Sequence, residues 1–198
     1  MRVLILVLWM LIPVGAFAYH LGPGQSDMKR DKVALLLADA NGFVEKENWA
    51  EAETLYKSAL ELLPEDEIVI NRRTRLELAK CQLMNKGLPQ ANEDLKVLVD
   101  ELEAEENPNP GMLADARTAL ANSQYYITWL MRVEGRPETD WEPEITSSQQ
   151  IYRLLAEEES AKGVNEELIA IRKSDLESAV KLARMDLGEL QGLPLPSQ

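Results

Sequence analysis

The chain has 198 residues, which is enough for one domain or one short repeat array and excludes a large multidomain enzyme. Hydrophobic residues make up 45% and charged residues 28%, so the chain has enough apolar surface to bury a core. Its 34 acidic and 21 basic residues give a formal net charge of -13, which argues against nucleic acid as a partner, because phosphate contacts need basic side chains. One histidine, His20, and one cysteine, Cys81, exclude an internal disulfide, a His/Cys zinc site and a triad with an internal histidine.

Residues 1–18 have the layout of a signal peptide. A basic second residue precedes a nearly continuous apolar stretch over 3–14, and Ala16-Phe17-Ala18 fits a cleavage site after Ala18. The apolar stretch is a little shorter than the roughly 20 residues of a membrane span. We therefore expect an exported protein, periplasmic or secreted, and retention of this segment as a membrane anchor is the alternative. In the exported chain Cys81 is the lone thiol, and its place in an apolar-periodic helix predicts that it is buried.

The pattern after residue 26 predicts an all-α fold, because apolar residues recur three and four positions apart and no alternating β-branched run occurs. A loop is expected over 19–26 and a Pro-rich tail over 192–198. Two further Pro-rich stretches, 107–111 and 136–145, are expected to be irregular, because proline disfavours helix in the residue before it. The expected helices, which end at Gly, Pro or capping residues, are 27–46, 49–63, 68–86, 89–105, 112–134, 146–162 and 165–190.

The first two pairs of helices share a pattern of small and aromatic residues. In the run 48–66, NWAEAETLYKSALELLPED, small residues let two helices approach, an aromatic fills the gap and a proline closes the hairpin: Ala52, Tyr56, Ala59 and Pro64. This run resembles the second half of a tetratricopeptide (TPR) repeat. The second pair repeats the pattern more weakly, with Gln82 at the place of the family's aromatic, through Ala79, Ala91, Leu95 and Leu98.

The resemblance implies a TPR-like α-solenoid of about three antiparallel helix hairpins over residues 27–162. The third hairpin fits only if the insert 136–145 is allowed, so a generic α-hairpin bundle is the alternative for 112–162; its matching residues are Ser123, Tyr126, Ser148, Tyr152 and Leu155. A helix within 163–191 follows, with apolar residues three and four apart at Ile169, Leu176, Val180, Ala183, Leu187 and Leu190. Because the last hairpin of an array needs a cover, we expect this helix to cap it, and self-association through it is the alternative.

The resemblance also implies that the first helix of each hairpin lines a concave binding face. If Ala40, Ala79 and Ser123 are equivalent, the residues after them and those two turns earlier share that face. The partner-binding candidates are then Asn41, Arg73, Lys80, Arg117 and Gln124. Basic and amide groups of this kind suit an acidic segment or a carboxylate. In so acidic a chain, the alternative is that these basic residues pair with neighbouring Asp and Glu.

The remaining motifs do not indicate an enzyme. Acidic runs lack the spacing of a calcium loop, and no carboxylate stands in an apolar stretch that would raise its pKa, so no catalytic residue, metal or cofactor is expected. Tyr125, Tyr126 and Trp129 have core spacing, whereas Trp141 in the insert is either packed down or open to a partner. The sequence thus predicts a non-enzymatic TPR-like adaptor or scaffold of the bacterial cell envelope, monomeric or homodimeric, that binds a protein or peptide. The alternative is a membrane-anchored structural or assembly protein that self-associates through its C-terminal helix.

Overall fold

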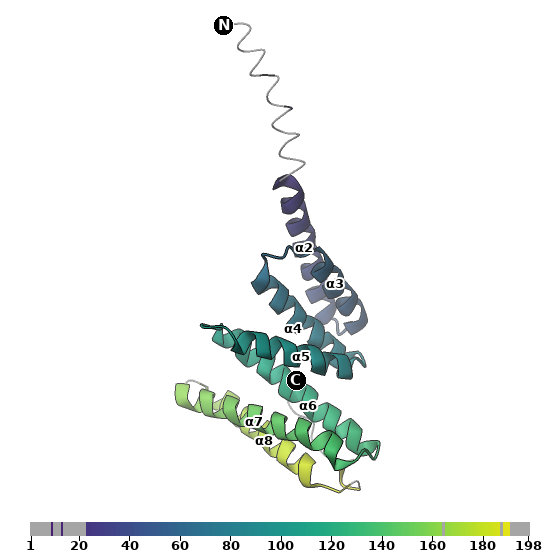
Figure 1. Ribbon diagram of the computed structural model, residues 1–198, viewed down its shortest axis with the longest axis vertical. Helices are drawn as coiled ribbons and strands as arrows, with labels where there is room; N and C mark the ends of the chain where they lie inside the picture. Colours follow the sequence, from purple (N-terminus) through teal and green to yellow (C-terminus); the bar gives the residue numbers. More distant parts are fainter. Residues whose placement is uncertain (1–8, 10–12, 14–22, 164, 187, 191–198) are drawn as a thin grey trace. The chain divides into compact units, whose positions relative to one another are not determined.

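The computed structural model describes residues 9, 13, 23–163, 165–186 and 188–190, so the expected signal segment and the C-terminal tail lie almost entirely outside the described residues. Within the described part the chain forms seven α-helices and no strand, and the all-α prediction is confirmed (Figure 1). The helices are α2 (Pro23–Val44), α3 (Trp49–Leu62), α4 (Ile68–Met84), α5 (Leu88–Glu103), α6 (Pro110–Val133), α7 (Glu138–Lys162) and α8 (Glu166–Arg184). No helix among these residues is long and apolar enough to span a membrane.

The chain divides into two compact units, residues 1–74 and residues 75–198, with the boundary inside α4. In the N-terminal unit, α2 packs against α3 through small and aromatic side chains. The Tyr56 hydroxyl of α3 donates a hydrogen bond to Asn41 Oδ1 of α2 at 2.6 Å. Arg30 of α2 pairs with Asp66 at 3.1 Å and Glu67 at 2.9 Å, and thereby joins α2 to the turn that follows α3.

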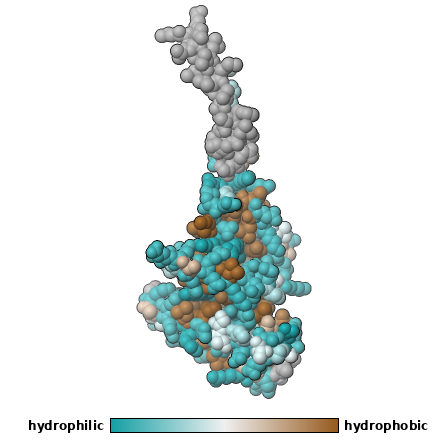
Figure 2. All heavy atoms as spheres, in the orientation of Figure 1, coloured by the Kyte–Doolittle hydropathy of each residue, from teal (hydrophilic) through white to brown (hydrophobic). Residues whose placement is uncertain are grey.

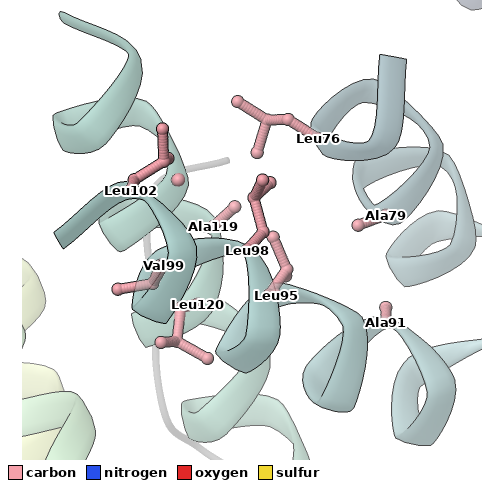
Figure 3. Packing of buried hydrophobic residues seen from close by; sticks show 10 residues of the cluster. Leu76, Ala79, Ala91, Leu95, Leu98, Val99, Leu102, Ala119 and Leu120 are labelled. Carbon is pink, nitrogen blue, oxygen red and sulfur yellow. The ribbon is translucent and has the colours of Figure 1, made fainter. Parts of the chain in front are cut away.

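In the C-terminal unit, α5 packs against α6, α6 against α7 and α7 against α8, and the unit encloses two apolar clusters. The first cluster lies between the last turns of α4, α5 and the start of α6, where Leu76 points toward Leu98 (Figure 3). The second joins the end of α6 to α7 and α8 through Tyr125, Trp141, Ile145, Tyr152, Ala179 and Leu182. Cys81 is buried in α4, as its position in the apolar pattern predicts.

Arg132, near the end of α6, ties three helices together. Its guanidinium donates hydrogen bonds to the carbonyl oxygens of Leu182 and Met185 at the C-terminus of α8. The same group lies 4.7 Å from the centroid of the Trp141 ring on α7. A cation at this end of α8 satisfies carbonyls that have no partner within the helix and complements the helix dipole.

Burial recurs at the same spacing in three helices. Residues at positions 0, +4 and +7 of a second helix are each at most 2% exposed in α3, α5 and α7: Ala52, Tyr56 and Ala59; Ala91, Leu95 and Leu98; Ser148, Tyr152 and Leu155. The small residues Ala40, Ala79 and Ser123 of α2, α4 and α6 are equally buried. The positions that the sequence pattern singles out are therefore the ones at which helices meet within each unit.

The expectation of an irregular insert over residues 136–145 is wrong, because most of this stretch is helical. Helix α7 begins at Glu138 and contains Pro143, whose missing N–H leaves the Thr139 carbonyl without its partner in the helix. Trp141 and Ile145 are buried in the second cluster, and their burial outweighs the lost hydrogen bond. Trp141 is therefore packed down rather than open to a partner.

Other helix ends also differ from the expectation. Helix α6 includes Pro110 and Gly111, because proline is tolerated in a first turn and the Asn109 side chain caps the helix by accepting from the Met112 N–H at 3.0 Å. The described part of helix α2 starts at Pro23, so residues 23–26, which were expected to belong to a loop, are helical. The cap at Asn165 is confirmed, since its side chain accepts from the Leu168 N–H at 3.0 Å.

The packed face of α8 also lies one residue away from the expected seam. As expected, Leu176 and Ala183 contact the second cluster from its margin, and Leu190, which follows the helix, is buried in it. The buried residues within α8 itself are Asp175, Ser178, Ala179 and Leu182. The helix ends at Arg184 rather than at residue 190. Two of the four buried residues are polar, which is why an apolar pattern did not reveal this face.

We predict that Leu98→Ala lowers the free energy of unfolding of the C-terminal unit by about 2–5 kcal/mol, because it leaves a cavity between α4, α5 and α6. Val97→Ala is the matched control: Leu98 is 1% exposed and its neighbour Val97 is 52% exposed. The control is expected to change stability by no more than about 0.5 kcal/mol. Urea unfolding followed by circular dichroism measures both, and equal losses would contradict the packing described for α5.

Candidate functional site

The five sequence-predicted binding residues lie on α2, α4 and α6, and the structure places them in different surroundings. Asn41 is exposed on α2 and accepts the hydrogen bond from Tyr56. Arg73 and Lys80 lie seven residues apart on α4, with Glu77 between them, so the three share one side of this helix. Arg73 is exposed and Lys80 half-buried. The Lys80 ammonium pairs with Glu77 of the same helix at 3.2 Å.

Arg117 of α6 is held by carboxylates from two other helices. Its Nε and Nη2 donate to Glu103 Oε1 of α5 at 2.9 and 2.8 Å, and its Nη1 donates to Glu158 Oε1 of α7 at 3.0 Å. The Arg117 side chain is 14% exposed. Its charge is thus neutralised inside the fold, which is the alternative that the sequence left open for the basic candidates.

Gln124 lies on the enclosed side of α6. Its side chain is buried, and its Oε1 has no hydrogen-bond partner among the described residues. Residues 119–125 of α6 are all buried, so this segment offers a partner no surface within the C-terminal unit. Helical spacing placed Gln124 in line with Asn41 and Lys80, but spacing does not show how many neighbours surround a helix.

A buried polar network that sequence reasoning missed lies next to Gln124. The Ser123 hydroxyl donates to Asn92 Oδ1 at 2.8 Å, and Asn92 Nδ2 donates to Glu144 Oε2 of α7 at 3.4 Å. Lys96 of α5 completes the network through Glu144 Oε1 at 2.6 Å. Burial by itself would lower the pKa of Lys96, but the hydrogen bonds and charges of Glu144 and Glu93 raise it above its usual value. The only sequence signal for this network is Asn92, a polar residue next to Ala91 on the packed face of α5.

Two buried tyrosines complete the interior of the C-terminal unit. Burial, with a smaller contribution from Tyr126, raises the pKa of Tyr125 from 10.0 to about 12. Burial, followed by the nearby Asp175, also raises the pKa of Tyr152, whose hydroxyl donates to Asn122 Oδ1 at 2.6 Å. Both hydroxyls therefore stay protonated at neutral pH, and the hydrogen bond from Tyr152 to Asn122 joins α7 to α6. No group of three or more His, Cys, Asp or Glu side chains among the described residues is arranged to hold a metal ion.

Comparison with protein-family models, with curated proteins and with solved structures gives no match for this chain. The function of the chain is therefore inferred from its own residues and contacts.

We predict that stability falls as the pH rises from about 10 through 12. An unfolded tyrosine loses its proton near pH 10, whereas folded Tyr125 and Tyr152 keep theirs, so the folded state binds more protons in this window and deprotonation favours unfolding. The loss should approach about 1.4 kcal/mol per pH unit for each tyrosine. Urea unfolding at pH 8 to 11.5 measures it. Tyr125→Phe and Tyr152→Phe should each make the decline shallower, and an unchanged slope in both variants would refute this cause.

Proposed function

We propose that this chain is a non-enzymatic, TPR-like adaptor of the cell envelope that binds a partner protein through the first helices of its hairpins. The observation that carries the proposal is the recurrence of buried positions at 0, +4 and +7 in α3, α5 and α7, together with the buried small residues of α2, α4 and α6. A repeated hairpin that packs through the same positions suits an array, and arrays of helix pairs bind partners along an extended face. The composition of residues 1–18 supports export.

The basic face of α4 is the part of this surface that we propose contacts the partner. The Lys80–Glu77 pair is three residues apart on one helix and partly solvated, and such pairs contribute at most about 1 kcal/mol. An acidic segment or a carboxylate of the partner can therefore replace Glu77 as the companion of Lys80 at little cost. Arg117 is different, because moving it would leave Glu103 and Glu158 without their shared cation.

The packing of α8 supports the capping role over self-association. Ala179 and Leu182 are fully buried against α6 and α7, and Arg132 binds the carbonyls at the end of the helix. Of the expected seam residues, Leu176 and Ala183 also contact this cluster, whereas Ile169 and Val180 are half-buried outside it.

We predict that Arg73→Glu combined with Lys80→Glu reduces partner capture at least about tenfold, because it turns the basic face of α4 acidic and repels an acidic partner. The measurement is cross-linking in intact cells, purification of the chain and quantitative mass spectrometry of what is attached to it. Circular dichroism should show that the helical content is kept.

The control for this prediction is Lys57→Glu combined with Lys162→Glu. These two lysines are about half exposed, pair with glutamates on their own helices and lie on α3 and α7, so the control makes the same charge change away from α4. If both variants retain their partners equally and keep their fold, the α4 face is not the partner-binding surface. Loss in both would show that net charge, and not this face, governs capture.

A further inference from the structure

The side of α2 that faces away from α3 carries exposed apolar side chains. Met28 is 58% exposed and Leu35 is 67% exposed, although both belong to a helix whose opposite side is buried through Val33 and Ala40. At about 100° per residue, Met28, Leu35 and Gly42 lie within about 20° of one line along the helix. Figure 2 shows hydrophobic side chains among hydrophilic ones on the surface of the molecule. Met28 and Leu35 are among the exposed large hydrophobic residues of the described chain.

Positions equivalent to this outer face are covered in the later first helices. On the equivalence of Ala40, Ala79 and Ser123, Asp39 corresponds to Leu78 and Asn122, and Gly42 corresponds to Cys81 and Tyr125. Leu78, Asn122, Cys81 and Tyr125 are all buried, whereas Asp39 is exposed and Gly42 is only half-buried. The outer face of α2 is thus the counterpart of a packed face, and among the described residues it stays exposed at Met28 and Leu35.

We propose that a second copy of this chain covers this face, with the two α2 helices antiparallel about a two-fold axis at Leu35. With a rise of about 1.5 Å per residue, Met28 and Gly42 lie about 10.5 Å on either side of Leu35, so an antiparallel copy sets Met28 opposite the second copy's Gly42. A Cβ placed on Gly42 would have no described atom within 4 Å, which leaves room for the methionine side chain.

Charge complementarity selects this pairing. Lys32 and Asp39 are both exposed and lie on the same flank of the face, about 60° and 40° from Leu35 and about 4.5 and 6 Å from it along the axis in opposite directions. The two-fold operation therefore brings each Lys32 across from the second copy's Asp39, and forms two ion pairs around the apolar centre. A parallel two-fold arrangement would instead put Lys32 and Asp39 of one copy and those of the other on opposite flanks of the interface, where neither ion pair forms. The self-pairing face lies on α2 and is separate from the partner-binding face proposed on α4.

A charge swap on the full chain tests the proposal. Analytical ultracentrifugation in a mild non-ionic detergent, at low salt, should show a dimer for the unaltered protein. Lys32→Asp and Asp39→Lys should each raise the dimer dissociation constant by about tenfold or more, because each sets two like charges face to face. The double variant restores both ion pairs with reversed polarity and should return the constant to within a few-fold of the original.

Matched variants on α2 distinguish a loss of the contact between the two copies from a loss of the fold. Ala34→Glu adds a charge at an exposed position about 100° away from Leu35 and should leave the dimer intact. Leu35→Cys should form a disulfide-linked dimer on mild oxidation, because the two copies meet at this residue, whereas Ala34→Cys should not. A monomeric unaltered protein, or a dimer that neither single charge change weakens, would overturn the proposal.

Discussion

The close approach of neighbouring helices at small, fully buried residues is the constraint on which the rest of the structure depends. Ala40 and Ala52 meet this need in the N-terminal unit with methyl groups alone. In the C-terminal unit Ala79 and Ala91 do the same, but the corresponding places of α6 and α7 hold Ser123 and Ser148, whose buried hydroxyls require acceptors. Ser148 donates to the Ala121 carbonyl and Ser123 to Asn92, so the same steric solution brings a polar network into one unit and not into the other.

The fold was predictable where local pattern and tertiary packing agree. Helical periodicity located the seven helices of the described residues, and burial at Ala52, Tyr56 and Ala59 followed from the spacing. The start of α7 was not predictable, because the local effect of Pro143 opposes helix and only burial of Trp141, which depends on a distant part of the chain, overcomes it. The face of α8 escaped prediction for a related reason: Asp175 and Ser178 are polar yet buried, and a hydropathy pattern cannot show that a polar group has partners.

The candidate site divides in the same way. Spacing correctly put Arg73 and Lys80 on one side of α4, because residues seven apart on a helix share a face whatever surrounds it. Spacing could not show that Arg117 meets carboxylates from α5 and α7, or that α6 is enclosed around Gln124, since both are properties of contacts between helices. The sequence therefore shows which face of a helix a charged residue lies on, but not whether that residue is accessible to a partner. In a chain with a net charge of -13, a basic residue readily finds acidic neighbours.

The burial of Cys81 has a practical consequence. It is the single thiol of the chain and lies within α4, so a thiol reagent can reach it only when the surroundings of that helix open. At low reagent concentration the labelling rate reports the equilibrium for this opening, much as amide hydrogen exchange does. The rate at which Cys81 is labelled therefore measures local unfolding around α4 in the unaltered protein.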